Sequence, residues 1–317
     1  MRVLVTGGAG FIGSNLLREL VSRPEVSSLA IIDDFSTGFR ENLQGVDVEL
    51  FEASILDVAA LSRATAEADA VVHLAALGSV PRSVKDPVTT HAVNATGTLC
   101  VLEAARAAGN AHVVLASSSS VYGANCQLPK TETMRCQPMS PYAVSKLATE
   151  GYAEVFATVY GLPVLPFRFF NVFGPRQRAG HVYAAVIPVF LDAALRGDRL
   201  PINGDGTFSR DFTYVGTVTR ILADAVIDHV SAGATNLAFG TRTTLLDLVD
   251  ALGRVMETRL EVEFRDPRPG DVPHSQADNR QLKSLFPDIM PVPLEQGLTE
   301  THAWMSGHVQ RSQGGAS

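Results

Sequence analysis

Short runs of consecutive apolar residues alternate with longer amphipathic segments through the first half of the chain. The runs fall at 3–5, 29–32, 48–51, 70–74, 112–116 and 164–169. Runs this short and this uniformly apolar are typical of parallel strands buried on both faces. Because apolar residues recur at helical spacing between them, the pattern predicts an α/β fold with a right-handed, doubly wound parallel sheet.

Two of the helical segments are marked by the residues at their ends. Ser140 and Pro141 are residue types preferred at a helix N-cap and in the first helical turn, and this helix is predicted to reach about residue 160. A second pattern, at 87–108, contains Asn94 and ends before a glycine, which is a common helix stop. We therefore predict one long helix over each segment.

The regular alternation weakens after residue 170. Prolines become frequent, and helical patterns are separated by turns rich in glycine. We predict a sheet-bearing domain at 1–170, a smaller mixed α/β part at 171–305 whose segments interleave with it, and a disordered tail at 306–317. The tail is predicted from its glycines, serines and glutamines.

Composition and charge exclude several classes of protein. The 317 residues are 46% hydrophobic and carry a formal net charge of −7, as in an ordinary globular protein. An acidic chain without basic stretches lacks the electrostatic footprint of a nucleic-acid-binding protein, and an anionic ligand would need local arginines. No apolar stretch approaches the roughly 18 residues that span a bilayer. We therefore expect neither a nucleic acid nor a membrane as a partner.

The cysteines and the start of the chain predict a cytoplasmic protein. Cys100, Cys126 and Cys136 are odd in number and lack metal-ligand spacing, which favours reduced thiols. The histidines are scattered as well, so no metal site is predicted. Met1 leads directly into the first strand, which leaves no secretory signal.

The turn after the first strand has glycines at Gly7, Gly10 and Gly13, followed at once by a helical pattern. In a Rossmann fold such glycines allow the tight turn, the approach of a pyrophosphate and close packing of the helix. The second strand ends in Asp33, twenty residues after Gly13, where a carboxylate can bind an adenosine ribose. Since this carboxylate would repel a 2′-phosphate, the sequence predicts NAD rather than NADP. A glycine turn in another kind of α/β protein is the alternative.

Three residues could form a proton-transfer site. Tyr142 and Lys146 are spaced i, i+4 at the start of a helix, which places the phenol and the ammonium on one face. A nearby positive charge favours the phenolate, so Lys146 is predicted to lower the pKa of Tyr142 and make it a base. Ser118, at the end of a strand, could bind the same reacting oxygen. From spacing alone, a packed surface pair is an equal alternative.

A series of motifs resembles the extended short-chain dehydrogenase/reductase family. In chain order they read TGGAGFIG, Asp33, HLAA, SSSSVYG, SPYAVSK, RFFNVFGPRQR, GDGTFSRDFTYV and RPGDV. The chain most resembles the family's NAD-dependent nucleotide-sugar epimerases and dehydratases, above all the UDP-glucose and UDP-N-acetylglucosamine 4-epimerases. The resemblance covers about residues 1–304. It implies that Ser118, Tyr142 and Lys146 are catalytic.

The resemblance also implies the NAD site. Its residues would be Gly7, Gly10, Phe11, Ile12, Gly13, Asp33, Asp34, Thr37, Gly38, Ser54, Ile55, Leu74, Ala75, Ala76, Asn94, Tyr142, Lys146 and Phe169. At the adenine pocket relatives carry an acid followed by Ile or Leu, whereas this chain has Ser54 and Ile55. A serine accepts a weaker hydrogen bond than a carboxylate, and NAD binding is still expected.

The UDP-sugar site is implied in the same way. Its residues would be Ser79, Ser118, Ser119, Tyr142, Asn171, Arg178, Ala185, Val186, Ile202, Asn203, Arg210, Arg268, Asp271 and Ser275. Arg210 and Arg268 resemble the arginines that clamp the UDP pyrophosphate, for which a planar guanidinium is well suited. Asn203 stands where relatives often have an aromatic residue.

The resemblance implies a 4-epimerase that oxidises the sugar transiently at C4. Tyr142 would take the proton of the 4-hydroxyl, while tightly bound NAD accepts and returns the hydride. Related 4,6-dehydratases place Asp and Glu after the catalytic Ser or Thr, whereas this chain has Ser119 and Ser120, which favours epimerisation. The small Ser275 leaves room for a 2-N-acetyl group, so UDP-glucose and UDP-N-acetylglucosamine both stay open. Arg178 could instead pair with the C6 carboxylate of UDP-glucuronate.

Other activities on the same scaffold are alternatives. They are a 4,6-dehydratase, a decarboxylase and a non-enzymatic NAD sensor, since a fold alone does not fix a function. A sensor would be expected to lose the tyrosine or the lysine, and this chain keeps both. The helical patterns after Pro87 and Ser140 resemble those that form a homodimer interface in this family, so a homodimer is expected.

Overall fold

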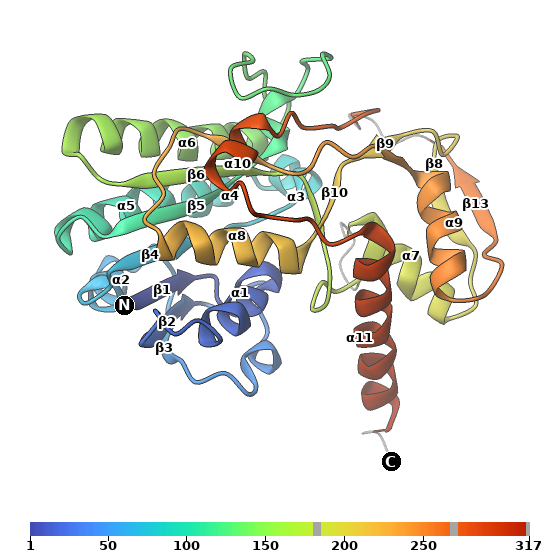
Figure 1. The fold of residues 1–317 in the computed structure, drawn as a ribbon, viewed down its shortest axis with the longest axis horizontal. Coiled ribbons are helices and arrows are strands. Elements are labelled where there is room, and N and C mark those ends of the chain that lie inside the picture. Colours follow the sequence, from blue (N-terminus) through green and yellow to red (C-terminus); the bar gives the residue numbers. More distant parts are fainter. Residues whose placement is uncertain (180–184, 267–271, 315–317) are drawn as a thin grey trace.

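The computed structural model describes residues 1–179, 185–266 and 272–314, with side chains up to residue 307. A seven-stranded parallel sheet forms its centre, in the order β11-β6-β5-β4-β1-β2-β3 (Figure 1). The strands are β1 (Arg2–Thr6), β2 (Ser28–Asp33), β3 (Glu49–Glu52), β4 (Ala70–His73), β5 (His112–Ser118), β6 (Val164–Phe169) and β11 (Thr235–Leu237). The predicted fold class, a Rossmann-type doubly wound parallel sheet, is confirmed.

Helices cover both faces of this sheet. On one face, α1 (Phe11–Val21) and α8 (Val215–Ile227) pack on each other and on the strands through a continuous apolar core. The other face is covered by α2 (Val58–Thr65), α5 (Gly97–Ala107) and α6 (Pro141–Tyr160). This double cover explains why the central strands are apolar on both sides.

The boundary of the sheet-bearing domain is not a single point in the sequence. Strand β11 pairs in parallel with β6, and α8 packs against α1. Both elements follow residue 170, so the later part of the chain returns to complete the sheet.

The predicted helix at 87–108 is present but irregular. It consists of α4 (Pro87–His91), a π-helical turn η2 (Ala92–Thr96) and α5, preceded by the short α3 (Val80–Lys85). Asn94 lies within the π turn with only 1% of its surface exposed. A π turn inserts an extra residue into the helix, a change that periodicity of apolar residues does not reveal.

The C-terminal part is small and mixed. Its elements are β7 (Asn171–Phe173), α7 (Val186–Leu195), β8 (Leu200–Asn203), β9 (Ser209–Arg210), β10 (Phe212–Tyr214), β12 (Thr243–Thr244), α9 (Leu245–Val255), β13 (Val262–Arg265), α10 (Arg280–Leu285) and α11 (Leu294–Gly314). Strands β7 and β10, β9 and β12, and β8 and β13 form three two-stranded sheets. A separate apolar core holds this part together. Short turns η1 (Arg40–Leu43) and η3 (Ser119–Tyr122) complete the described elements.

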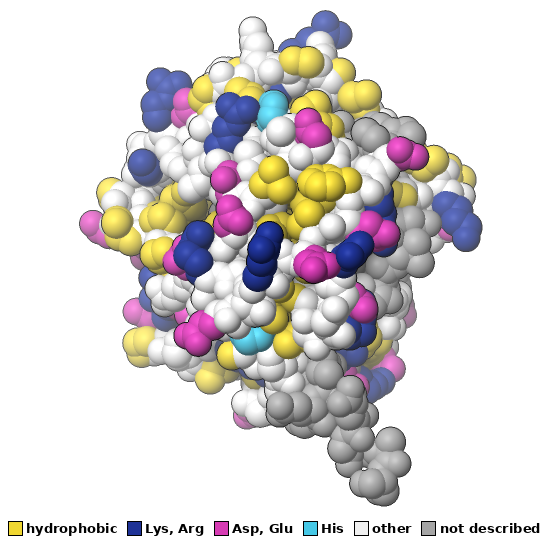
Figure 2. Space-filling view, turned by 90° about the vertical axis from the view of Figure 1, so that its right-hand side faces the viewer, with side chains coloured by type: hydrophobic (Ala, Val, Ile, Leu, Met, Phe, Trp, Pro, Cys, Tyr) yellow, Lys and Arg dark blue, Asp and Glu magenta, His cyan; other side chains and the backbone are white. Residues whose placement is uncertain are grey.

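Charges of both signs are interspersed on the face formed by α7, α9 and β13 (Figure 2). Arg196 pairs with Asp192 and Asp198, and Arg199 pairs with Glu261 on the adjoining segment. These exposed pairs are individually worth less than about 1 kcal/mol. The face is therefore charged without a strong net sign.

The tail prediction needs a correction. Helix α11 continues to Gly314, so it covers most of the segment at 306–317 that composition predicted to be disordered; residues 315–317 lie outside the described part. Leu298 and Met305 of this helix are buried in the C-terminal core. Once these residues anchor the helix, each further residue adds one hydrogen bond without the cost of nucleation. The helix can therefore continue through residues with low helix propensity.

Candidate active site

The glycine turn between β1 and α1 is tightly packed. Gly7 has a φ of 71°, and a Cβ on this residue would lie 2.8 Å from the amide nitrogen of Ala75. A Cβ on Gly13 would lie 2.3 Å from the carbonyl oxygen of Gly7. Helix α1 then starts at Phe11 without a side-chain cap. Its first amides thus remain available to an anion at the positive end of the helix, as a pyrophosphate requires.

Asp33 is the residue predicted to bind the adenosine ribose. It is the last residue of β2 and is 8% exposed. Its Oδ2 accepts a hydrogen bond from the Ala9 amide (2.9 Å) and its Oδ1 accepts one from the Phe35 amide (2.8 Å). Burial raises the pKa of Asp33, and the two amides oppose this rise. Since a carboxylate can accept about four hydrogen bonds, Asp33 keeps capacity for ribose hydroxyls.

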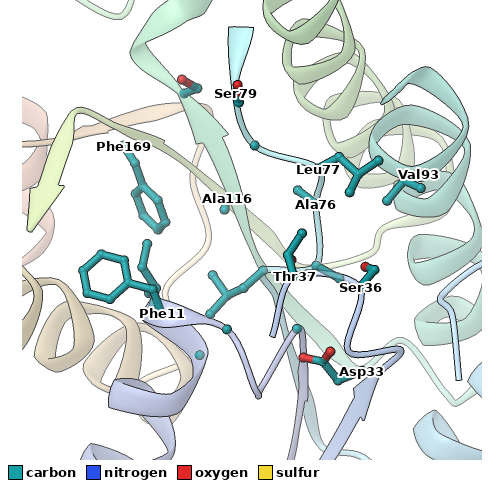
Figure 3. A pocket seen from close by; sticks show the side chains of 18 of the residues that line it. Phe11, Asp33, Ser36, Thr37, Ala76, Leu77, Ser79, Val93, Ala116 and Phe169 are labelled. Carbon is teal, nitrogen blue, oxygen red and sulfur yellow. The ribbon is translucent and has the colours of Figure 1, made fainter. Parts of the chain in front are cut away.

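A cavity of about 510 Å³ lies at the carboxyl ends of these strands. In Figure 3 the rings of Phe11 and Phe169 lie on one side of it, and Asp33, Ser36 and Thr37 lie on another. Most of the predicted NAD-binding residues line it: Gly7, Gly10, Phe11, Ile12, Gly13, Asp33, Asp34, Thr37, Ser54, Ile55, Leu74, Ala75, Ala76, Tyr142, Lys146 and Phe169. The glycine cradle and the free helix amides fit a dinucleotide.

Two predicted NAD-binding residues stand behind the cavity wall. Asn94 accepts a hydrogen bond on Oδ1 from the Leu77 amide (2.7 Å), and its Nδ2 donates to the carbonyl oxygen of Leu77 (3.2 Å) and to Ser145 Oγ (3.0 Å). It therefore fixes the loop after β4, whose residue Leu77 does line the cavity. A Cβ on Gly38 would lie 2.9 Å from the Cβ of Ala9, so this glycine allows two loops to pack closely.

The predicted catalytic residues meet at one end of this cavity. Ser118 ends β5, and Tyr142 and Lys146 lie in the first turns of α6, which Ser140 caps by accepting a hydrogen bond from the Ala143 amide. All three predicted residues line the cavity, and the side chains of Ser118 and Tyr142 share a hydrogen bond. The structure therefore brings the proposed base and its partner together.

Burial is the main cause of the pKa shifts of Tyr142 and Lys146 in the chain alone, and the effect of Lys146 together with the nicotinamide charge on Tyr142 stays a prediction. Burial raises the pKa of Tyr142, and the hydrogen bond with Ser118 opposes the rise. Burial also lowers the pKa of Lys146 to about 8, and its Nζ donates to the carbonyl oxygen of Ala116 (2.7 Å). Removal from water therefore shifts the pKa of both groups in the direction that favours their neutral forms.

A second cavity of about 190 Å³ adjoins the first. Asn171, Val172, Gln177 and Ala185 line both cavities, so they form a shared wall. The predicted substrate residues Asn171, Ala185, Val186, Asn203 and Arg210 line the second cavity, and Ser79, Ser118, Tyr142, Asn171 and Ala185 line the first. The two cavities therefore adjoin each other, and each is lined by several of the predicted substrate residues.

The structure corrects the prediction for Ile202. It was predicted to contact the substrate, but its side chain is fully buried in the C-terminal core. Side chains alternate along a strand, so in β8 the neighbours Pro201 and Asn203 face the cavity instead.

The arginines predicted for the diphosphate are only partly described. Arg210 lines the second cavity, and its guanidinium donates to the carbonyl oxygens of Ser209 (3.0 Å) and Pro273 (3.1 Å). Arg268 and Asp271 lie outside the described residues. Ser275 lies beside the same strand, where its amide donates to the Ser209 carbonyl oxygen (3.0 Å). Among the described residues, neither Ser275 nor Ser119 lines a cavity of this site.

Arg178 is also placed away from both cavities. Its guanidinium carbon lies 3.6 Å from the ring centroid of Phe39, and it pairs with Glu41 in η1. The prediction that this arginine faces the sugar is therefore corrected: it joins the loop after β7 to the loop after β2. Stacking and ion pairing together hold a guanidinium at such a site.

Several lining residues were not predicted. Gln177 separates the two cavities, and its Nε2 donates to the carbonyl oxygen of Val172 (3.2 Å). Phe208, Phe212 and Leu245 line the second cavity from three different segments. Only the RFFNVFGPRQR motif, which contains Gln177, could have pointed to this residue. The apolar lining residues have no local pattern that separates them from core residues.

The comparisons with known proteins assign the class. The sequence model of the NAD dependent epimerase/dehydratase family matches residues 3–239. The chain belongs to this family, and NAD is its cofactor. Among curated relatives, it is 37% identical over 308 residues to a UDP-glucose 4-epimerase of Mycolicibacterium smegmatis, covering 95% of this chain and 97% of the relative.

Two solved structures are similar over nearly the whole chain. A UDP-N-acetylglucosamine 4-epimerase from Methanobrevibacter ruminantium, in complex with UDP-N-acetylmuramic acid, is 36% identical with a TM-score of 0.91, covering 97% of this chain and 98% of its own. A UDP-glucose 4-epimerase from Thermotoga maritima with UDP-glucose is 34% identical with a TM-score of 0.92, covering 98% of this chain and 100% of its own.

No group of three or more metal-ligating side chains was found among the described residues. Within the same part of the chain, no helix is both long and apolar enough to cross a bilayer.

Proposed function

We propose that this protein is a UDP-sugar 4-epimerase. The observation that carries the proposal is the position of Ser118, Tyr142 and Lys146 in a cavity that continues into a second cavity lined by Arg210. The names of the relatives support the same assignment, since they include UDP-glucose and UDP-N-acetylglucosamine 4-epimerases. NAD would occupy the first cavity and the UDP-sugar the second.

The residues of the chain supply binding and proton transfer. Bound NAD supplies a reversible hydride acceptor at the sugar C4. The glycine turn and the start of α1 hold its pyrophosphate, and Asp33 holds its adenosine ribose. Tyr142 would accept the proton of the sugar 4-hydroxyl, and Ser118, which shares a hydrogen bond with Tyr142, would also bind that oxygen. Lys146, whose pKa burial lowers to about 8, would stabilise the tyrosinate in its charged form, together with the charge of the bound nicotinamide.

The substrate end of the site is built for a diphosphate. Arg210, and Arg268 beyond the described residues, would clamp the two phosphates by bidentate hydrogen bonds. The clamp holds the UDP while the sugar turns over, so that either face of C4 can meet the cofactor. Ser119 and Ser120 replace the acid pair of the dehydratases, which supports epimerisation over loss of water.

The sugar is UDP-glucose or UDP-N-acetylglucosamine in this proposal. The relatives named above include a UDP-glucose 4-epimerase and a UDP-N-acetylglucosamine 4-epimerase, which supports both substrates. UDP-glucuronate is the second candidate, because a UDP-glucuronic acid 4-epimerase from Bacillus cereus is among the similar solved structures, at 28% identity and a TM-score of 0.88. To meet a C6 carboxylate, Arg178 must leave Phe39 and Glu41.

The three UDP-sugars distinguish these candidates. Purified protein without added NAD is incubated separately with UDP-glucose, UDP-N-acetylglucosamine and UDP-glucuronate, and the 4-epimers are resolved by chromatography. We expect one of the first two to interconvert, because NAD is regenerated in each turnover and stays bound. Loss of water or of carbon dioxide would assign a dehydratase or a decarboxylase instead. No reaction even with added NAD would support a sensor.

We propose a cytoplasmic homodimer. The described cysteines Cys100, Cys126 and Cys136 are free, which suits a reducing compartment. Apolar side chains are exposed on α3, α4 and α6, and these helices pack side by side. They are Val84 (66% exposed), Val88 (77%), Val144 (50%), Val155 (50%) and Val159 (64%). A second copy would cover them in a four-helix interface.

Light scattering tests the homodimer. We expect a mass of twice 33.8 kDa for the wild type. The double variant Val88→Asp, Val155→Asp places charges in the interface and is expected to be monomeric. Val21→Asp, at a similarly exposed valine (58%) at the end of α1, serves as the matched control and is expected to stay dimeric. A monomeric wild type would refute the proposal.

A further inference from the structure

A carboxylate outside the catalytic set lies fully buried beside the second cavity. Asp211 has 0% of its surface exposed and sits between Arg210 of β9 and Phe212 of β10. Both of these neighbours line the cavity. A buried carboxylate is costly unless hydrogen bonds compensate it, so its partners indicate what it does.

Its partners come from two distant segments of the chain. Oδ2 accepts hydrogen bonds from the amides of Gly240 (2.9 Å) and Ala277 (3.0 Å). Oδ1 accepts from the amide (3.2 Å) and the hydroxyl (2.9 Å) of Thr241. Four donors thus satisfy both oxygens. The segment at 240–241 and the segment around 277 are fastened to the strand that carries Arg210.

These segments surround Arg210. The segment that ends at Ala277 supplies the Pro273 carbonyl oxygen that accepts from the Arg210 guanidinium (3.1 Å). The segment that follows Thr241 forms β12, whose Thr243 pairs with Arg210 in the antiparallel ladder. On the other side, the main-chain oxygen of Asp211 accepts from the amide of Asn171 (3.2 Å), which lines both cavities.

We infer that Asp211 is a positioning residue for UDP binding: by fastening the 240–241 and 273–277 segments, it sets the guanidinium of Arg210 toward the diphosphate. This inference rests on the proposed function for the identity of the ligand. It assigns to Asp211 an effect on affinity for the nucleotide, since Asp211 is not among the residues that line the cavity with Tyr142 and Lys146.

The variant Asp211→Asn tests this role. The asparagine amide replaces one of the two acceptor oxygens with an NH2 donor. This donor faces backbone amides, so the hydrogen bonds that hold the two segments are weakened. We expect KM for the UDP-sugar and the dissociation constant for UDP, measured by calorimetry, to rise about tenfold, a free-energy difference of about 1.4 kcal/mol. We expect kcat to change by less than about twofold, and the NAD content to stay as in the wild type. Asp205→Asn is the matched control, because Asp205 is exposed and caps only the local turn at Thr207.

A role in stability alone gives a different result. If Asp211 only stabilises the fold, the variant would lose activity per milligram and NAD content together, and its KM would be unchanged. That result would overturn the inference. If Asp211→Asn does not fold, Thr241→Val removes only the hydroxyl donor, and a KM within the error of the wild type would equally overturn it. A wild type that binds UDP but converts no UDP-sugar refutes the proposed function, while the calorimetric comparison still decides the role of Asp211.

Discussion

Replacing Tyr142 by phenylalanine is expected to lower kcat by about 10²–10⁴-fold, the range that a positioned general base contributes. The ring remains, so the packing at the start of α6 is retained, while the oxygen that accepts the substrate proton is lost. The purified variant is expected to keep its NAD, because the glycine turn and Asp33, which line the same cavity, are proposed to bind the cofactor and are unchanged. Chromatography of the 4-epimers measures the rate, and the absorbance of released cofactor measures NAD.

The matched control is Tyr160→Phe. Tyr160 ends the same helix, is 47% exposed and contacts Phe156 and Arg106 through its ring, which the variant keeps. Its activity is expected to equal that of the wild type. If Tyr142→Phe retained more than about a tenth of the wild-type kcat, Tyr142 would not be the base. A loss of NAD with the loss of activity would point to cofactor binding instead.

Replacing Arg168 by methionine is expected to reduce the free energy of unfolding by about 3–5 kcal/mol, because it leaves a buried charge unpaired. Arg168 of β6 meets Glu150 of α6 through two hydrogen bonds, Nε to Oε1 (2.9 Å) and NH2 to Oε2 (2.8 Å). The side chains of Arg168 and Glu150 are only 6% and 8% exposed. Ser117, which lines the first cavity, also donates to Glu150. Unfolding in urea, followed by circular dichroism, measures the loss.

Two further variants test whether an unpaired buried charge causes this loss of stability. The double variant Arg168→Met, Glu150→Gln removes both charges and is expected to recover a large share of the stability, since the unpaired charge is gone. Arg196→Met breaks two exposed ion pairs at the end of α7, with Asp192 and Asp198, and each is expected to cost less than about 1 kcal/mol. If Arg168→Met cost no more than Arg196→Met, the buried pair would not be a main source of stability at this place.

The parts of the site that could be predicted are those whose signal is local. Gly7, Gly10 and Gly13 lie within seven residues between a strand and a helix, and Asp33 follows the next strand. Such a motif fixes the backbone and the ligand together, because the turn is the binding site. Ser140 likewise begins a helix by its own hydrogen bond, so it placed Tyr142 near the cavity correctly.

Other residues could not be placed because their positions depend on partners far away in the sequence. In β8, a shift of one residue decides whether Ile202 or Asn203 faces the cavity, and an isolated four-residue strand gives no register. Arg178 lies on Phe39 because two loops about 140 residues apart meet there. Phe212 and Leu245 cannot be told from core residues in the sequence, and only the folded structure shows that they line the second cavity.

The same long separation governs how this chain can fold as it leaves the ribosome. Helix α8 and strand β11 come after residue 214, so two thirds of the chain is made before Leu16, Leu17 and Leu20 of α1 receive their cover. At about 5–20 residues per second, the edge of β6 waits several seconds for β11. During this interval the nascent chain exposes an open strand edge and an apolar helix face, both of which favour aggregation. We therefore expect that the first 170 residues do not fold as an independent unit.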